Sequence, residues 1–182
     1  MSGGIMKIKT DFVTNSSSSA FIVLFDKIIK TIDDLKYLIC GYDITSKTEQ
    51  VLKDALSQKP LKITESSKEK VTKLMVHQIS CGTVYDIDDK FDYFTSMKTF
   101  CEREYITQDE LYKNRTWMNA FYKEQDILKN KQLTKKVLEF IKNNDGKYVY
   151  IFTYGDEDGE FFSEMENGGT FTMLPNIHIS MH

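Results

Sequence analysis

The spacing of apolar residues changes twice along this chain and divides it into three parts. Residues 20–25 are continuously apolar, which is typical of a central strand covered on both faces, and residues 6–13 predict a strand before it. Between residues 31 and 144 the apolar positions recur at helical spacing. After residue 148 the chain returns to short strand-like runs separated by turn residues.

The middle part predicts helices with recognisable start signals. A hydroxyl residue followed three positions later by an acidic residue satisfies the first amides of a helix. This spacing occurs at Thr31 with Asp34, Ser46 with Glu49, Ser66 with Glu69, and Thr107 with Glu110. We therefore expect helices over residues 31–38, 48–56, 68–79, 96–104, 107–128 and 132–144, with a strand over residues 83–87. The sequence Asn-Asp-Gly at residues 144–146 predicts the end of the last helix.

The last part predicts strands over residues 148–154, 161–162, 170–174 and 177–181. Strands at both ends with helices between them indicate the α+β fold class, with a mostly antiparallel sheet built from N- and C-terminal strands and covered by helices from the middle of the chain. An alternative arrangement places the helices of residues 90–145 in a separate subdomain. Residues 1–5 read as an added leader before a native start at Met6, which leaves residues 6–182 as a single α+β domain.

Composition narrows the class of protein. Hydrophobic residues make up 41% of the 182 positions, enough for a core, and the formal net charge of −3 lacks the basic surplus that favours nucleic acid as a partner. The three cysteines, Cys40, Cys81 and Cys101, are widely spaced, which argues against a disulfide framework and against a thiolate zinc site. Since no membrane-length apolar run and no signal peptide are evident, we expect a cytoplasmic protein without a membrane partner.

A run of polar residues separates the first two predicted strands. Asn15, Ser16, Ser17, Ser18 and Ser19 present hydroxyls and successive amides that suit a small anion, and the serines are also possible acceptors for phosphorylation. No Gly frames the run and no Lys follows it, so a Walker phosphate loop is excluded. The simpler interpretation is a hairpin connection, because Asn and Ser hydrogen-bond their own backbone.

The same region carries a resemblance. Residues 7–22 combine a basic strand, the sequence Phe-Val-Thr-Asn, the serine run and a closing Ala-Phe-Ile. This order resembles the N-terminal signature of a set of uncharacterised bacterial and phage proteins, and residues 154–159 and 177–182 are similar to the ending of some members. Lys9 and Ala20 depart from that signature, where Arg and Ser are more usual. The resemblance implies kinship and implies no activity.

The C-terminal part offers candidate metal ligands. Asp156 and Asp158 lie in an acidic turn that suits a hard cation, and His178 follows on the last predicted strand. The simpler interpretation of the turn is a hairpin, because Asp158 and Gly159 both adopt positive φ readily. His178 and His182 cannot share one metal within a strand, since four residues span roughly 13 Å. His182 would then belong to a fraying polar edge strand.

Two further groups have plain structural interpretations. His77 and Cys81 lie four residues apart on a predicted helix, and nothing nearby completes a catalytic site. The lysines around the last predicted helix are diluted by Glu124, Asp126 and Glu139, which is typical of a solvated face.

Two main functional hypotheses follow, beside a third in which the protein is a substrate for modification. The first is a binding or regulatory module that uses the loop of Ser16 to Ser19 to hold a protein partner or small anion, with no cofactor. The alternative is a metal-dependent phosphoester hydrolase or transferase, in which Asp156, Asp158 and Glu164 or Glu166 hold Mg²⁺ or Mn²⁺ and His178 acts as base. Both require the two chain ends to meet.

Overall fold

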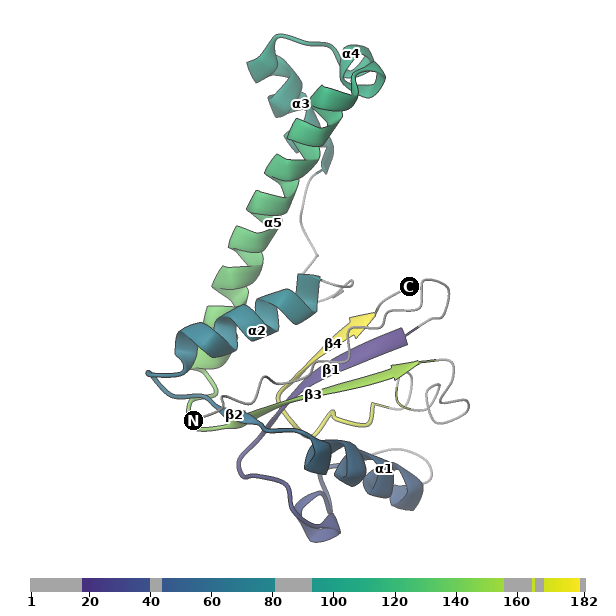
Figure 1. Ribbon diagram of the computed structural model, residues 1–182, viewed down its shortest axis with the longest axis vertical. Helices are drawn as coiled ribbons and strands as arrows, with labels where there is room; N and C mark the ends of the chain where they lie inside the picture. Colours follow the sequence, from purple (N-terminus) through teal and green to yellow (C-terminus); the bar gives the residue numbers. More distant parts are fainter. Residues whose placement is uncertain (1–17, 40–43, 81–92, 156–164, 166–168, 181–182) are drawn as a thin grey trace, which may run out of the picture.

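The computed structural model describes residues 18–39, 44–80, 93–155, 165 and 169–180, and Figure 1 shows their arrangement. The elements follow the chain as strand β1 (Ser18–Phe25), the short 3₁₀ helix η1 (Ile32–Asp34), α1 (Ile44–Ser57), β2 (Leu61–Lys62), α2 (Lys68–Ser80), α3 (Tyr93–Glu104), α4 (Gln108–Lys113), α5 (Arg115–Lys142), β3 (Tyr148–Gly155) and β4 (Asn176–Ser180). The predicted α+β class, with strands at both ends and helices between them, is confirmed.

Among the described residues the sheet has four strands in the order β2-β3-β1-β4, and their three pairings are antiparallel. The N-terminal strand β1 lies between the C-terminal strands β3 and β4, as predicted. Its residues from Ser19 to Phe25 are all buried, which explains the continuous apolar run in the sequence.

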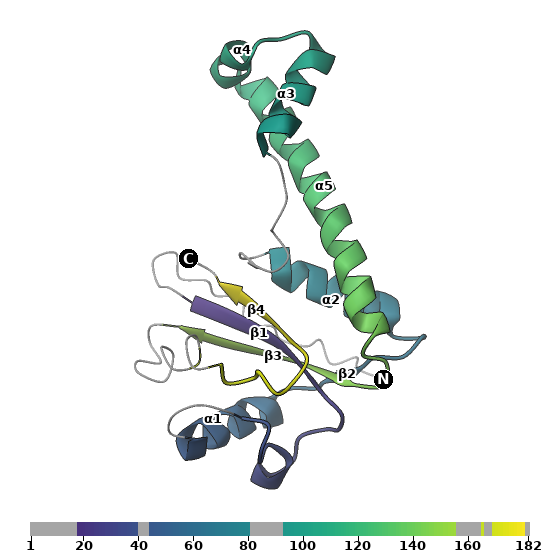
Figure 2. The same ribbon diagram turned by 180° about the vertical axis from the view of Figure 1, so that it is seen from behind.

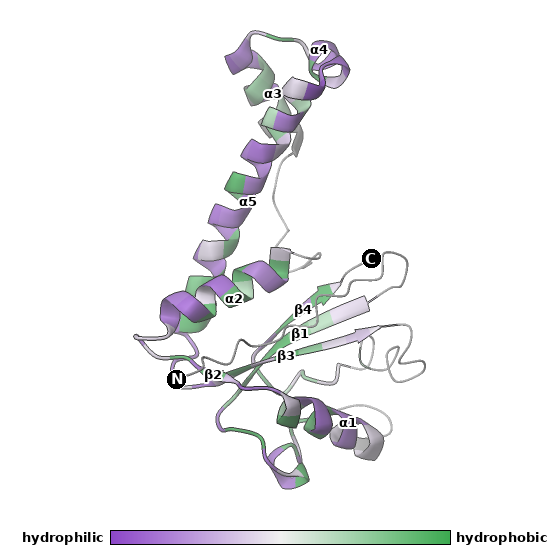
Figure 3. Ribbon diagram, in the orientation of Figure 1, coloured by the Kyte–Doolittle hydropathy of each residue, from purple (hydrophilic) through white to green (hydrophobic). Residues whose placement is uncertain are grey.

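Each face of the sheet has its own core. On one face Phe21, Val23 and Phe25 pack with aromatic residues of β3 and with α1. On the other face Ala20, Ile22 and Leu24 pack with α2 and with the C-terminal half of α5. Figure 3 shows the green, hydrophobic strands between these layers, in contrast to the mainly purple outer turns of the helices.

Helix α5 continues beyond the sheet and carries α3 and α4 at its far end, as both views show (Figures 1 and 2). This tip encloses a third core cluster, made of Met97, Phe100, Cys101, Leu111 and Phe121. The guanidinium of Arg103 in α3 donates two hydrogen bonds to Glu124 in α5, at 3.0 and 2.7 Å, and so links these two helices. The C-terminal half of α5 therefore packs on the sheet, whereas its N-terminal half packs with α3 and α4 in a separate cluster.

Two predicted elements are wrong in their boundaries. We expected a helix over 107–128 and a second over 132–144, but α5 is continuous and the break falls at Asn114 instead. The Asn114 Oδ1 accepts hydrogen bonds from the amides of Thr116 and Trp117, so this residue caps a new helix. The apolar residues before residue 130 face the cluster at the tip, and those after it face the sheet. This change of direction gives the sequence pattern of two separate helices.

Other predictions differ in type. The segment 170–174, predicted as a strand, is a turn in which Gly169 has φ of +59° and the Asn176 side chain donates to the carbonyls of Phe171 and Leu174. The predicted helix over 31–38 is reduced to η1, although Asp34 accepts from the Thr31 amide as its capping spacing predicted. The predicted strands over 6–13, 83–87 and 161–162 lie outside the described residues.

Candidate functional site

Three strands end together at one edge of the structure, which we call the serine end of the sheet. Ser18 stands opposite Gly155, and Ser19 stands opposite both Tyr154 and Ser180. The first residues of β1 therefore meet the last residues of β3 and β4 (Figure 1). This arrangement brings the N- and C-terminal strands into one sheet, as both functional hypotheses require.

The two serines of the polar run that the structure describes, Ser18 and Ser19, lie on different faces of the sheet. We predicted a turn that ends at Ser19, but β1 already begins at Ser18. Because side chains alternate along a strand, Ser18 shares the α2-covered face with Gly155, while Ser19 shares the α1-covered face with Tyr154. Of these two serines, Ser19 is the one placed toward the site described below. Asn15, Ser16 and Ser17 lie outside the described residues.

Polar side chains gather on the α1-covered face at the serine end. Ser19, Tyr154 and Ser180 are 0%, 3% and 4% exposed, and the register places His178 on the same face. The Tyr154 hydroxyl and the His178 Nε2 are both fully buried. Buried hydrogen-bonding groups are therefore concentrated on one face of the sheet at this end.

Helix α1 adds a charged residue to this face. Lys47 is only 1% exposed, although lysine is rarely buried, and Thr48 beside it is 6% exposed. Lys47 lies one helical turn before Val51, a member of the same core cluster as Tyr154, so its side chain faces the sheet. The first turns of α1 lie on the same side of the molecule as the end of β3 (Figures 1 and 2).

The turn before β4 adds a hydroxyl. Thr170 is 1% exposed, and its Oγ1 has no hydrogen-bond partner among the described residues. The next residue, Phe171, packs on Phe21 and Phe152 with ring centroids 5.5 and 5.2 Å apart, which holds the turn against the sheet. We call Ser19, Lys47, Tyr154, Thr170 and His178 the polar cluster.

The predicted metal site is not assembled from the described residues. Asp156 and Asp158 lie outside them, and no three His, Cys, Asp or Glu side chains among the described residues are grouped so that they could hold a metal ion. The His178 ring stacks on Phe21 with centroids 4.5 Å apart and planes 5° apart. This contact gives His178 a packing role that the sequence did not predict.

Sequence reasoning missed Lys47, Tyr154 and Thr170. A signal for Lys47 was available, because it precedes Val51 and Ala55 by four and eight residues on an amphipathic helix. The sequence places Tyr154 in a strand and at the start of the C-terminal resemblance but marks no role for its hydroxyl, and no sequence signal marks the buried hydroxyl of Thr170.

Comparisons add no relative to this fold and site: no family model matches the chain, no curated protein matches its sequence, and no solved structure matches its fold. Within the part of the chain that the structure describes, no helix combines the length and apolarity needed to cross a bilayer. The fold and site thus define an α+β protein with buried polar side chains on the α1-covered side of its sheet.

Proposed function

We propose that this chain is a binding module that holds a small oxyanion, such as phosphate, in the polar cluster at the serine end of the sheet. This proposal keeps the predicted binding role of the serine run and narrows it to Ser19 and to residues that approach it from other elements. The observation that supports it best is the burial of the Lys47 side chain at the first turns of α1.

The chemistry of the cluster suits an oxyanion. A buried ammonium attracts negative charge more strongly than an exposed one, because water no longer screens it. Hydroxyl groups of Ser19, Tyr154 and Thr170 are able to donate to the oxygen atoms of an anion. Thr170 offers a buried hydroxyl that no described residue engages.

The alternative function, a phosphoester hydrolase or transferase that uses Mg²⁺ or Mn²⁺, is less favoured by the same geometry. A general base or metal ligand must bring its nitrogen within reach of the reacting atoms. The His178 Nε2 is fully buried and its ring lies against Phe21. These contacts favour holding an anion over activating a nucleophile.

Calorimetric titration with inorganic phosphate tests the proposal. We expect saturable binding by the wild-type protein and at least tenfold weaker binding by Lys47→Met, since a hydrogen bond to a charged group contributes about 1.5–3 kcal/mol. Methionine preserves the length and apolar stem of lysine, so the helix packing is retained. Lys53→Met is the matched control, because Lys53 lies on the exposed side of the same helix.

The outcomes separate the two functions. Equal phosphate affinity in Lys47→Met and wild type, or no binding in either, contradicts the proposal. Turnover of a phosphodiester substrate that requires Mn²⁺ and disappears in His178→Ala supports the alternative function instead.

A further inference from the structure

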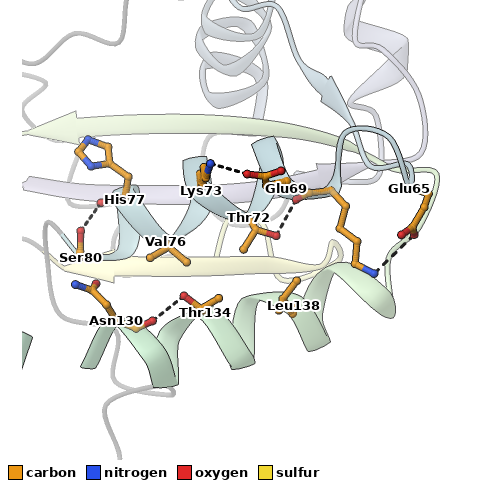
Figure 4. A pocket seen from close by; sticks show the side chains of 11 residues that line it. Glu65, Glu69, Thr72, Lys73, Val76, His77, Ser80, Asn130, Thr134 and Leu138 are labelled. Atoms are coloured by element: carbon orange, nitrogen blue, oxygen red, sulfur yellow. Dashed lines mark hydrogen bonds and ion pairs between the residues drawn. The ribbon is translucent and has the colours of Figure 1, made fainter. Parts of the chain in front are cut away.

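A groove of about 800 Å³ lies between α2 and α5, on the other side of the sheet from the polar cluster. Figure 4 shows Thr72 and Val76 of α2 facing Thr134 and Leu138 of α5 across it. These four side chains form a floor of methyl and methylene groups. Leu138 remains 37% exposed, so packing within the protein leaves part of this floor open.

The α5 wall of the groove extends beyond the end of α2. Ile127 precedes Leu138 by eleven residues and lies within about 20° of it around the helix axis, roughly 16 Å further along. Its side chain is 59% exposed. Ile127, Thr134 and Leu138 therefore line one face of α5 over about three turns, a length that matches a short helix of a partner.

The border of the groove along α5 is basic. Lys131, Lys135 and Lys142 are exposed and lie within about 60° of Leu138 around α5. Among the described residues no carboxylate forms an ion pair with any of these three lysines. On the opposite border the charges that line the groove balance, because Lys73 pairs with Glu69 at 2.6 Å and Lys68 pairs with Glu65 at 3.7 Å. The excess positive charge is thus confined to the α5 border.

We infer that this groove is a docking site for an acidic amphipathic helix of a partner protein. The apolar side of such a helix would cover Val76, Leu138 and Ile127, and its carboxylates would meet Lys131, Lys135 and Lys142. Nucleic acid fits less well, because phosphate binding uses the lysines and leaves the apolar floor without a partner. This inference is independent of the proposed anion site.

Fluorescence anisotropy with a designed peptide tests the docking site. The probe is a fluorescein-labelled 15-residue helix with Leu at positions i, i+4, i+7 and i+11 and Glu at most other positions. A scrambled peptide of the same composition controls for charge alone. We expect the probe to bind at micromolar concentration and the scrambled peptide to bind at least tenfold more weakly.

Two variants and a matched control locate the binding. Leu138→Glu and Lys131→Glu should each weaken probe binding at least tenfold, whereas Lys129→Glu should leave it unchanged. Lys129 and Lys131 are exposed lysines on one helix, but they point about 160° apart. Thermal unfolding of each variant confirms that the fold is retained.

Three results would overturn the inference: equal binding of probe and scrambled peptide, no binding of either, or equal losses in the Lys129 and Lys131 variants. A labelled DNA duplex that binds more tightly than the probe, and that Lys131→Glu weakens while Leu138→Glu does not, would assign the basic border to nucleic acid.

Discussion

The imidazole of His178 in β4 lies flat on the phenyl ring of Phe21 in β1, with ring centroids 4.5 Å apart. Phe21 and His178 are directly paired across the antiparallel strands, so the contact is a cross-strand pair on the α1-covered face. The stack fixes the edge strand β4 to the central strand and holds one side of the polar cluster.

A substitution of His178 should therefore lower the free energy of unfolding when it removes the ring that stacks on Phe21, and should have little effect when it keeps a ring there. We expect His178→Ala to reduce the free energy of unfolding by about 1–2 kcal/mol, because an aromatic pair contributes about 0.5–1.5 kcal/mol beyond the area it buries. His178→Phe keeps a ring on Phe21 and should stay close to the wild type. Urea denaturation measures both, and an unchanged midpoint in His178→Ala would show that the stack does not hold β4.

The hydroxyl of Tyr150 accepts a hydrogen bond from the buried amide of Ile29 at 2.9 Å, which anchors the chain after β1 to the sheet. Tyr150→Phe leaves that amide without its acceptor, and we expect a loss of about 1–3 kcal/mol at neutral pH. Urea denaturation checks this loss. Tyr148→Phe, on the same strand, is the control and should have little effect.

The same tyrosine predicts an alkaline dependence. Burial raises the pKa of Tyr150 above its ordinary value of 10.0. The folded state thus keeps a proton that the unfolded state releases, so the wild-type free energy of unfolding falls as pH rises above about 10. This fall should be shallower in Tyr150→Phe. Parallel slopes above pH 10 would contradict the assignment.

The sequence predicted the strands more accurately than the site. The run from Ala20 to Phe25 has one dominant explanation, a central strand, and the structure confirms it. The turn at Thr170 and the short strand β2 depend on contacts with distant segments, which local patterns do not record. The spacing of Lys47 before Val51 and Ala55 places it on the apolar side of its helix, whereas the degree of its burial follows from the docking of α1 on the sheet.

The continuity of α5 also depends on packing that the sequence pattern does not record. Phe121 faces the tip cluster and Leu133 faces the sheet cluster, so the apolar stripe changes direction within one helix. A single helix that serves two cores gives a pattern like two shorter helices. The sequence pattern alone therefore does not show that α5 is one continuous helix.

The tip cluster should unfold separately from the sheet. Phe121 is fully buried against Phe100, with centroids 5.3 Å apart, and Phe121→Ala should cost the tip about 3–5 kcal/mol. Hydrogen exchange should then show faster exchange of α3 and α4, with β1 and β3 still protected. Tyr122→Ala, at the exposed neighbouring position, is the control. Equal loss of protection in the sheet would show one cooperative unit.

Asp34 predicts an acid dependence of the segment around η1. Hydrogen bonds from Lys27 and from the amides of Lys30 and Thr31 hold the pKa of this carboxyl well below its ordinary value of 3.8. Its contribution to stability is present above about pH 4 and is lost as pH falls below that value, since the unfolded state then binds more protons.

A pH series of thermal unfolding checks the role of Asp34. Asp34→Asn should lower the melting temperature at neutral pH and should flatten the acid dependence, whereas Asp33→Asn should do neither. If both variants kept the acid slope of the wild type, other carboxylates would account for it.

The most direct test of the proposed anion site is to locate a bound anion by crystallography. Crystals soaked in tungstate, an oxyanion that scatters anomalously, should show a peak at the serine end of the sheet, within hydrogen-bond distance of the Lys47 Nζ and the Ser19 hydroxyl. The peak should be absent from crystals of Lys47→Met. Tungstate bound only at exposed lysines, or an identical peak in the variant, would contradict the account.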